Sequence, residues 1–147
     1  MNWSDPFEAL EPGATFTTGE RTITDVDVMA FAGLTDDHHP QHVDADWSAA
    51  STFGERVAHG MLVVSCAVGL VPFDPDRVIA LRGLDDVVFK RPVRLGDTIR
   101  VKGAVIALRS IGEEAGLVQW RWSVVNQRDQ LVARALVEVL WRGTPSR

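Results

Sequence analysis

The chain has 147 residues, of which 46% are hydrophobic and 24% are charged, and its formal net charge at pH 7 is −5. These values are typical of a globular domain with its own core and exclude a chain that is disordered throughout, so we expect residues 1–147 to form a single domain. No basic cluster is longer than Lys90–Arg91, which argues against a nucleic-acid partner.

The first elements predicted along the chain are a strand and a helix. Residues 14–23 are rich in threonine and follow a Pro-Gly turn, which is typical of a strand. Thr24 and Asp27 resemble a capping box, so a helix should begin there and end near Thr35. The spacing of its apolar residues predicts a core-facing stripe of Val28, Phe31, Ala32 and Leu34.

Two further helices are predicted after a polar loop. The loop covers residues 36–43, and Asp44 can then cap a short helix over residues 45–52. Residues 61–70 are apolar at nearly every position, a pattern that predicts a helix buried on all sides. Such a helix needs another layer of structure that can surround it.

The second half of the chain has the alternation that strands produce. Ile99, Val101 and Val105 alternate with Arg100 and Lys102, which is the period of a half-buried strand. The predicted strands cover residues 78–88, 98–108, 117–125 and 130–141. This order of elements indicates an α+β fold in which an antiparallel sheet wraps around the buried helix, the hotdog arrangement. The open sheet edge favours a homodimer or a higher homo-oligomer.

The chain carries few signals for export or membrane insertion. Cys66 is its one cysteine, so an internal disulfide is excluded and a thiolate metal site is disfavoured. Residues 1–5 lack the basic and apolar regions of a signal peptide. The apolar run over residues 61–73 is too short to span a membrane. We therefore expect a cytoplasmic protein that does not contact a membrane.

Titratable side chains gather in one part of the chain. All four histidines lie between positions 38 and 59, among several aspartates. Asp37 and His42 are the candidate catalytic pair, because hydration of a double bond needs one group to take a proton from water and another to protonate carbon. Pro40 stiffens the loop between them, and we expect His39 and Asp44 to support that loop.

The start of the buried helix supplies the second group of candidate residues. Free backbone N–H groups at His59 and Gly60 can bind the developing oxyanion of a thioester carbonyl, and glycine admits a ligand close to the backbone. The His59 side chain is more often structural at such a position than catalytic. Ser65 either lines the pocket or bonds a carbonyl one turn back, and Cys66 is expected to pack in the core.

Several segments resemble a known family. Residues 31–44 (FAGLTDDHHPQHVD) and 53–62 (FGERVAHGML) resemble the hydratase motif of (R)-specific enoyl-CoA hydratases in the MaoC-like family. The later segment FKRPV at 89–93 and the turn Gly96–Asp97 also resemble that family. The resemblance covers roughly residues 20–140, and the loop motif followed by His-Gly is much more specific than a lone short motif.

The resemblance implies both a reaction and roles for individual residues. Asp37 and His42 match the family's catalytic pair, which together hold the attacking water, and Gly60 matches the glycine whose N–H binds the thioester carbonyl. We expect Asp37 to act as the base and His42 to orient the water and protonate the α-carbon, a division of roles that the sequence leaves open. The implied reaction hydrates a trans-2-enoyl group on coenzyme A or an acyl carrier protein to the (R)-3-hydroxyacyl thioester, or runs in reverse. No cofactor is implied, since coenzyme A is part of the substrate. The chain departs from the family at His39, where Asn is usual, and at Asp36, often Gly.

Two other functions remain open at this point. A hotdog thioesterase hydrolyses the same class of ligand, and a non-catalytic subunit binds an acyl thioester without turnover. If the chain has no catalytic activity, Asp37 and His42 are polar residues of a solvated loop that cap a helix.

A metal site and a phosphate site are further possibilities. A metal site could be formed by His38, His39, His42, Asp44 and His59. Their spacing does not match a known zinc pattern, so we expect no metal. Arg91 and Arg94 are candidates for contact with the phosphates of coenzyme A.

Overall fold

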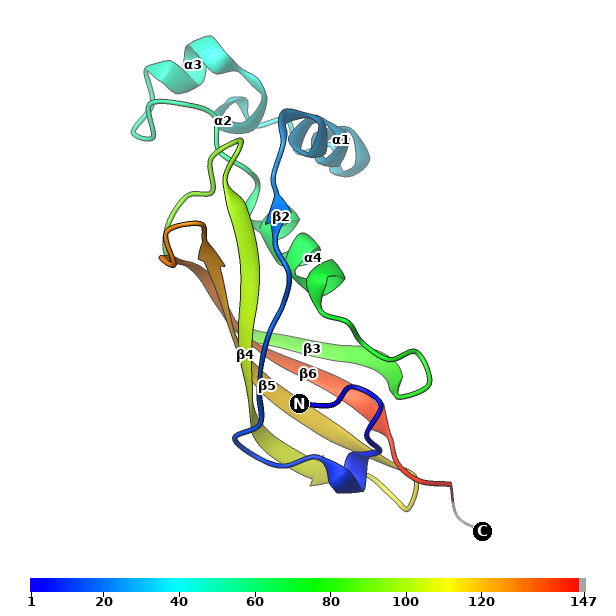
Figure 1. Ribbon diagram of the computed structural model, residues 1–147. Coiled ribbons are helices and arrows are strands. Elements are labelled where there is room, and N and C mark those ends of the chain that lie inside the picture. Colours follow the sequence, from blue (N-terminus) through cyan, green and yellow to red (C-terminus); the bar gives the residue numbers. More distant parts are fainter. Residues whose placement is uncertain (146–147) are drawn as a thin grey trace.

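An antiparallel sheet organises the computed structural model, which describes residues 1–145 (Figure 1). Its strands follow the order β1-β4-β5-β6-β3, and β2 also pairs with β4. The strands are β1 (Thr15–Thr17), β2 (Arg21–Thr22), β3 (Val78–Phe89), β4 (Thr98–Ser110), β5 (Ala115–Asn126) and β6 (Leu131–Arg142). The helical elements are the 3-10 turn η1 (Phe7–Ala9) and the α-helices α1 (Asp25–Thr35), α2 (Pro40–Val43), α3 (Ala45–Ala49) and α4 (Gly60–Leu70).

Helix α4 lies against the sheet and supplies one wall of the core (Figure 1). Leu62, Val63 and Ala67 of α4 are buried in the same cluster as Val101 of β4 and Val139 of β6. Alternate residues of β4 enter this core, as the sequence pattern indicates. The predicted α+β arrangement, an antiparallel sheet packed around a helix, is therefore confirmed.

The strand predicted over residues 14–23 is wrong in one respect, because β1 and β2 are separate. Residues 18–20 interrupt the ladder where the Thr18 hydroxyl takes the place of a backbone partner. The Val101 N–H donates to Thr18 Oγ1 at 2.9 Å, and the Thr18 N–H donates to the Val101 carbonyl at 2.9 Å. A threonine side chain that competes with the backbone in this way breaks strand pairing without removing the segment from the sheet edge.

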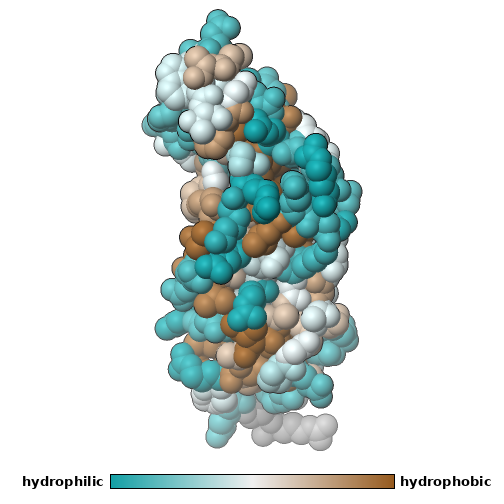
Figure 2. Space-filling model, turned by 90° about the vertical axis from the view of Figure 1, so that its left-hand side faces the viewer, coloured by the Kyte–Doolittle hydropathy of each residue, from teal (hydrophilic) through white to brown (hydrophobic). Residues whose placement is uncertain are grey.

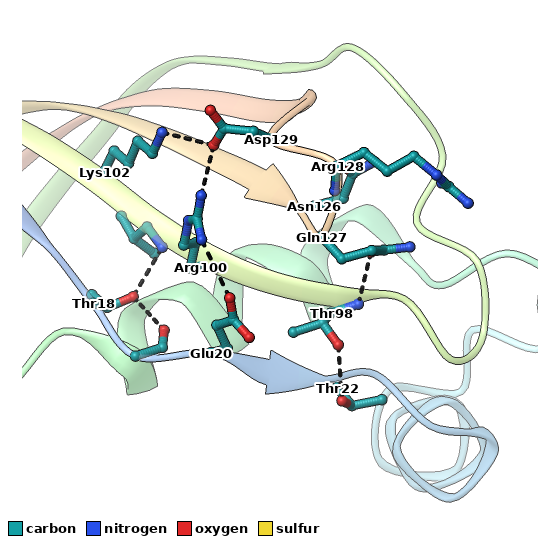
Figure 3. A network of polar contacts seen from close by, with 12 residues as sticks. Thr18, Glu20, Thr22, Thr98, Arg100, Lys102, Asn126, Gln127, Arg128 and Asp129 are labelled. Carbon is teal, nitrogen blue, oxygen red and sulfur yellow. Dashed lines mark hydrogen bonds and ion pairs between the residues drawn. The ribbon is translucent and has the colours of Figure 1, made fainter.

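A surface network of charges fixes this edge to the β5–β6 turn (Figure 3). Asp129 in the turn accepts from Lys102 at 2.7 Å and from Arg100 at 2.8 Å, and both of these hydrogen bonds hold the pKa of its carboxyl below the ordinary value. Arg100 also pairs with Glu20 at 3.3 Å. These carboxylates are exposed, so the network orients the turn and contributes little to core stability.

Helix α1 has the predicted cap but not the predicted apolar stripe. The Thr24 hydroxyl accepts from the Asp27 N–H, and the Asp27 carboxylate accepts from the Thr24 N–H, so the capping box is confirmed. Val28 is fully buried, whereas Leu34 is 83% exposed. The inclusion of Leu34 in the core-facing stripe is therefore wrong, since it lies on the outer face of α1.

The segment predicted as a loop over residues 36–43 contains a short helix, α2. Pro40 occupies its first turn, and Nδ1 of His39 accepts from the Gln41 N–H at 3.2 Å. Helix α3 follows at once and is capped by Asp44 as predicted, but it ends at Ala49, before the expected position 52. None of the helices within residues 1–145 has the length and apolar character needed to cross a bilayer.

The expectation that the long helix is buried on every side is wrong for the single chain. Met61 is 53% exposed and Ser65 is exposed, because the sheet covers α4 from one side. Edge strand β3 also leaves Ile79, Leu81 and Phe89 exposed. Figure 2 shows hydrophobic residues among hydrophilic ones along the side of the molecule that lies at left in Figure 1. An edge strand with exposed apolar side chains is typical of a surface that pairs with another chain.

Aromatic rings from the N-terminal segment, the segment between α4 and β3, and strands β5 and β6 pack together in the core. Trp3, from the N-terminal segment, packs edge-on against Phe73 with centroids 5.5 Å apart. Trp120 of β5 and Trp141 of β6 meet at 5.8 Å. The Trp141 indole N–H donates to the Asp5 carbonyl at 2.9 Å, which ties the N-terminal segment to the last strand.

Candidate active site

A cavity of about 430 Å³ opens between the α1–α2 loop, the start of α4 and the segment that follows β3. It brings together the two candidate catalytic side chains and the candidate oxyanion site, although they are up to 23 positions apart in sequence, from Asp37 to Gly60. Its lining includes Asp37, Gln41, His42, His59, Gly60 and Phe89. The spatial grouping of these residues agrees with the sequence-based prediction of a single site.

His42, at the end of α2, is 6% exposed and has a fixed tautomer. Its Nδ1 lies 2.7 Å from the Val57 carbonyl, which can only accept, so Nδ1 is assigned the proton. Burial lowers the pKa of the His42 imidazole below its ordinary value; the bond to Val57 opposes this shift, and the neighbouring His59 adds to it. The ring is therefore neutral at pH 7, with a bare Nε2 that can accept a proton.

Asp37 follows directly after the left-handed residue that ends α1. Asp36 has φ 60°, a conformation that aspartate tolerates better than most side chains, and it turns the chain out of the helix. The carboxylate of Asp37 then accepts from the His39 N–H at 3.3 Å. A carboxylate oxygen of Asp37 and one ring nitrogen each of His42 and His59 lie within 4.8 Å of one another.

His59 is 2% exposed and joins the other two side chains. Its Nε2 donates to the Asp37 carbonyl at 2.9 Å. Its ring stacks on that of His42 with centroids 3.8 Å apart and an interplanar angle of 25°. Phe31 of α1 packs against the His59 ring at 4.9 Å. Two imidazoles stacked in this way were not foreseen from the sequence.

Gly60 begins α4, and its missing side chain leaves room for a neighbouring ring. A Cβ at this position would lie 2.7 Å from Cζ of Phe89. No side chain among the described residues caps the helix start, so the first backbone N–H groups of α4 have no intrahelical partner and carry the positive end of the helix dipole. The start of α4 can therefore bind an oxyanion that enters the cavity.

The geometry of the histidines does not suit a single metal ion. Among the described residues, the side chains that lie close enough together to share an ion are Asp37, His42 and His59. The metal site considered from the sequence also contained His38, His39 and Asp44, and these lie outside that group. Lone pairs of imidazole lie in the ring plane, and two stacked rings hold theirs in nearly parallel planes that do not meet at one ion. The arrangement suits proton transfer and water better than metal coordination.

The remaining candidate residues have supporting positions or lie apart. Ser65 is exposed, does not line the cavity, and donates to the Met61 carbonyl at 2.7 Å, one turn back in α4. This is the structural alternative for Ser65, so its proposed contact with substrate is not supported. His39 and Pro40 form the start of α2, and Asp44 accepts from the N–H of Trp47 to cap α3.

Three residues of the site were missed in the sequence. Arg56 donates to the His42 carbonyl through Nε at 2.6 Å and pairs with Asp25 at 2.7 Å, so it fastens α2 to α1. Gln41 Nε2 lies 3.4 Å from His42 Nε2, and Phe89 covers Gly60. Gln41, Arg56 and Phe89 each fall within one of the resembling segments, which is the one signal that could have singled them out.

Known proteins similar in sequence carry the same domain. The family described as MaoC like domain matches residues 7–125. The chain is 39% identical to Protein MaoC of Klebsiella aerogenes over 131 residues, which are 83% of this chain and 39% of that protein. It is 34% identical over 105 residues to an (R)-specific enoyl-CoA hydratase of Rhodospirillum rubrum, covering 69% of this chain and 70% of the relative. The chain thus spans well under half of the Klebsiella protein.

The fold agrees with this assignment. A solved structure described as a monoamine oxidase regulatory protein of Archaeoglobus superposes with a TM-score of 0.89, at 39% identity over 95% of both chains. The hotdog arrangement expected from the sequence is therefore confirmed. The family match covers most of the chain and includes the α1–α2 loop and the start of α4, so the protein belongs to the MaoC-like dehydratase family.

Proposed function

We propose that the protein adds water to the double bond of a trans-2-enoyl thioester and forms the (R)-3-hydroxyacyl thioester, or catalyses the reverse dehydration. One observation carries the proposal: the Asp37 carboxylate, the bare nitrogen of His42 and the free N–H groups at Gly60 all face one cavity. The Rhodospirillum relative is an (R)-specific enoyl-CoA hydratase, which supports both the reaction and its stereochemistry.

His42 is the group better suited to take a proton from the attacking water. Its Nε2 lacks a proton because Nδ1 donates to Val57, and the lowered pKa keeps the ring neutral at pH 7. An ionised Asp37 carboxylate can only accept, so it receives the second hydrogen bond of the same water and orients the oxygen. These roles differ from the expectation that Asp37 is the base and that His42 begins as the proton donor.

The proposed step balances with one water molecule. The water oxygen bonds to C3 while one of its protons moves to His42 Nε2, and the π electrons shift toward the thioester oxygen. The backbone N–H of Gly60 stabilises the enolate that forms. The proton then passes from His42 to C2, so His42 returns to its neutral form and the net change is the addition of water.

We further propose that coenzyme A carries the acyl group. Lys90 and Arg91 follow β3, are exposed and line the same cavity. Neither forms an ion pair with a carboxylate among residues 1–145. Arg91 donates to the Leu131 carbonyl at 2.9 Å, which leaves its charge without a carboxylate partner. Cations at a cavity that lack a carboxylate partner suit the phosphates of coenzyme A. Arg94, the other cation expected there, pairs with Glu55 at 3.2 Å and is less available.

The test follows the enoyl absorbance of crotonyl-CoA and octenoyl-CoA, with chiral analysis of the product. Wild type should remove the absorbance without releasing thiol, and Asp37→Asn should lower kcat by about 10²–10⁴-fold. Asp36→Asn is the matched control: it removes the adjacent exposed carboxylate at φ 60°, a conformation that Asn also tolerates, and should keep activity.

Two results would contradict the hydratase proposal. Release of free thiol at a rate that depends on Asp37 would indicate a thioesterase. Tight binding of enoyl-CoA with its absorbance unchanged, on both substrates, would indicate a subunit that binds without catalysis.

We also propose that two copies pair along β3. This strand is a sheet edge, its Ile79 and Leu81 are exposed in the single chain, and Met61 of α4 is exposed as well. Light scattering should give the mass of a dimer or a multiple of it, and Leu81→Lys should shift the mass toward the monomer. A monomeric wild type would contradict this proposal and leave the hydratase test unaffected.

A further inference from the structure

We propose that His59 is a positioning residue for this reaction: it ties the Asp37 loop to the start of α4 and fixes the plane of the His42 ring, whose unprotonated Nε2 accepts a long hydrogen bond of 3.4 Å from Gln41 that the attacking water replaces. The inference rests on the hydratase function proposed above. It gives His59 a task separate from the acid–base pair and from the backbone donors at Gly60. Two contacts of the His59 ring and one buried nitrogen without a partner carry it.

The first contact is the hydrogen bond from His59 Nε2 to the Asp37 carbonyl, at 2.9 Å. It joins residues 22 positions apart. The other hydrogen bonds of residues 36–38 join neighbours only two positions apart, such as the Asp37 N–H to Thr35 Oγ1 and the His39 N–H to the Asp37 carboxylate. Among the described residues, His59 is therefore the one long-range hydrogen-bond partner of the loop that carries the carboxylate.

The second contact is the stack between the rings of His59 and His42. Centroids 3.8 Å apart and an angle of 25° fix the plane of the His42 ring, and hence the direction of its Nε2 lone pair. Phe31 supports the far side of the stack by packing against His59. His42 is thus held by Val57 along one edge and by His59 across one face.

The third feature is the remaining nitrogen of His59. Nδ1 is buried and has no hydrogen-bond partner among residues 1–145. Because Nε2 carries the proton that goes to the Asp37 carbonyl, Nδ1 of the neutral ring is an acceptor. A buried acceptor without a partner lowers stability, so it calls for a functional explanation, which the positioning of Asp37 and His42 supplies.

The electrostatic surroundings of His42 come from every element that packs against it. Asp37 raises the pKa of the His42 ring, whereas His59 and His39 lower it, and burial is the largest cause of the net lowering. Lys90 and Arg91 line the same cavity, and Arg56 donates to the His42 carbonyl. The charge that His59 carries when it is protonated opposes a second charge on the stacked His42 ring, so replacing His59 with an uncharged side chain should raise the pKa of His42.

Two variants separate the contacts. His59→Phe keeps a ring for the stack but has no donor for the Asp37 carbonyl. His59→Gln keeps an amide donor near the position of Nε2 but has no ring. We expect His59→Phe to lower kcat by about 10²-fold with little change in KM, because the carboxylate is misplaced, and His59→Gln to recover part of that loss. In both variants the acid limb of kcat/KM should move to higher pH, because the reaction needs neutral His42.

The control measurement is the NMR titration of the His42 ring in the free protein, together with thermal unfolding. A higher His42 pKa in both variants supports the proposal even if wild type proves inactive on enoyl thioesters, so its outcome is distinct from that of the hydratase test. If both variants are merely less stable, with wild-type kcat per folded molecule and an unchanged His42 titration, His59 is structural only and the proposal is overturned.

Discussion

The two ends of the molecule bury aromatic rings in different ways (Figure 1). Near α2, His42 and His59 stack at 3.8 Å beside a cavity, and one nitrogen of each ring donates to a backbone carbonyl. At the other end, Trp3, Trp120 and Trp141 pack with centroids 5.8–6.4 Å apart inside the core. Both clusters are made from segments far apart in the sequence.

Burial has different consequences for an indole ring and for an imidazole ring. The indole nitrogens of Trp120 and Trp122 are buried without a hydrogen-bond partner among the described residues, and this cost is met by the apolar packing of large rings. An indole N–H does not titrate, so burial of the tryptophan rings contributes to stability and supplies no group for acid–base chemistry. An imidazole does titrate, so the same burial at His42 changes a pKa and creates a proton acceptor. Stability and activity should therefore respond to mutations at opposite ends.

The largest effect on stability is expected at the tryptophan end. Trp141→Ala removes a fully buried ring and should lower the free energy of unfolding by about 3–5 kcal/mol. Trp141→Phe keeps most of the ring but loses the hydrogen bond to Asp5, and should cost less, since a hydrogen bond contributes about 0.5–1.5 kcal/mol. Urea unfolding measures both. A large change in kcat per folded molecule in Trp141→Phe would contradict the separation of the two ends.

The sequence predicts local features of this fold well because their causes are local. The Thr24–Asp27 capping box and the alternation along β4 depend on neighbours within a few positions, and both are present. The exposure of Met61 could not be predicted, because it depends on how far the sheet reaches around α4. The helix α2 was missed because His39 caps it through a ring nitrogen, which is not a usual capping group.

The candidate site was predictable as a set of residues but not as a geometry. Asp37, His42 and Gly60 were singled out by a resemblance and by their chemical types, and they line one cavity. The His42–His59 stack joins positions 17 apart and depends on the angle between α2 and α4, which no sequence pattern reports. The tautomer of His42, on which the proposed role of this ring as the base depends, is assigned from its hydrogen bond to the Val57 carbonyl, which no sequence pattern reports.

A smaller effect, on activity only, is expected from Gly60→Ala. The new Cβ would lie 2.7 Å from Cζ of Phe89, so the Phe89 ring must move, and that ring is half exposed and lines the cavity. We expect kcat/KM to fall by about 10²-fold, because a displaced ring misplaces the thioester. Phe89→Ala in the same chain should restore part of the loss. Equal losses in Gly60→Ala with and without Phe89→Ala would show that the close contact is irrelevant.

The smallest effect is expected in the pH dependence of stability. The pKa of His42 is lowered in the folded protein, mainly by burial, so between that pKa and the ordinary value of 6.5 the unfolded chain binds more protons than the folded one. The free energy of unfolding should therefore fall as the pH drops below 6.5. Carboxyl groups with a lowered pKa, such as Asp27, add a similar loss only below their ordinary value of 3.8, so the two ranges are separate.

Urea unfolding of wild type and His42→Gln across this range isolates the histidine. His42→Gln should flatten the slope between pH 6.5 and about pH 5, whereas Trp141→Phe, at the other end, should lower stability equally at every pH. If His42→Gln leaves the slope unchanged, burial does not keep this ring neutral. The assignment of His42 as the proton acceptor would then lose its electrostatic basis, and the hydrogen bond to Val57 would be its one remaining support.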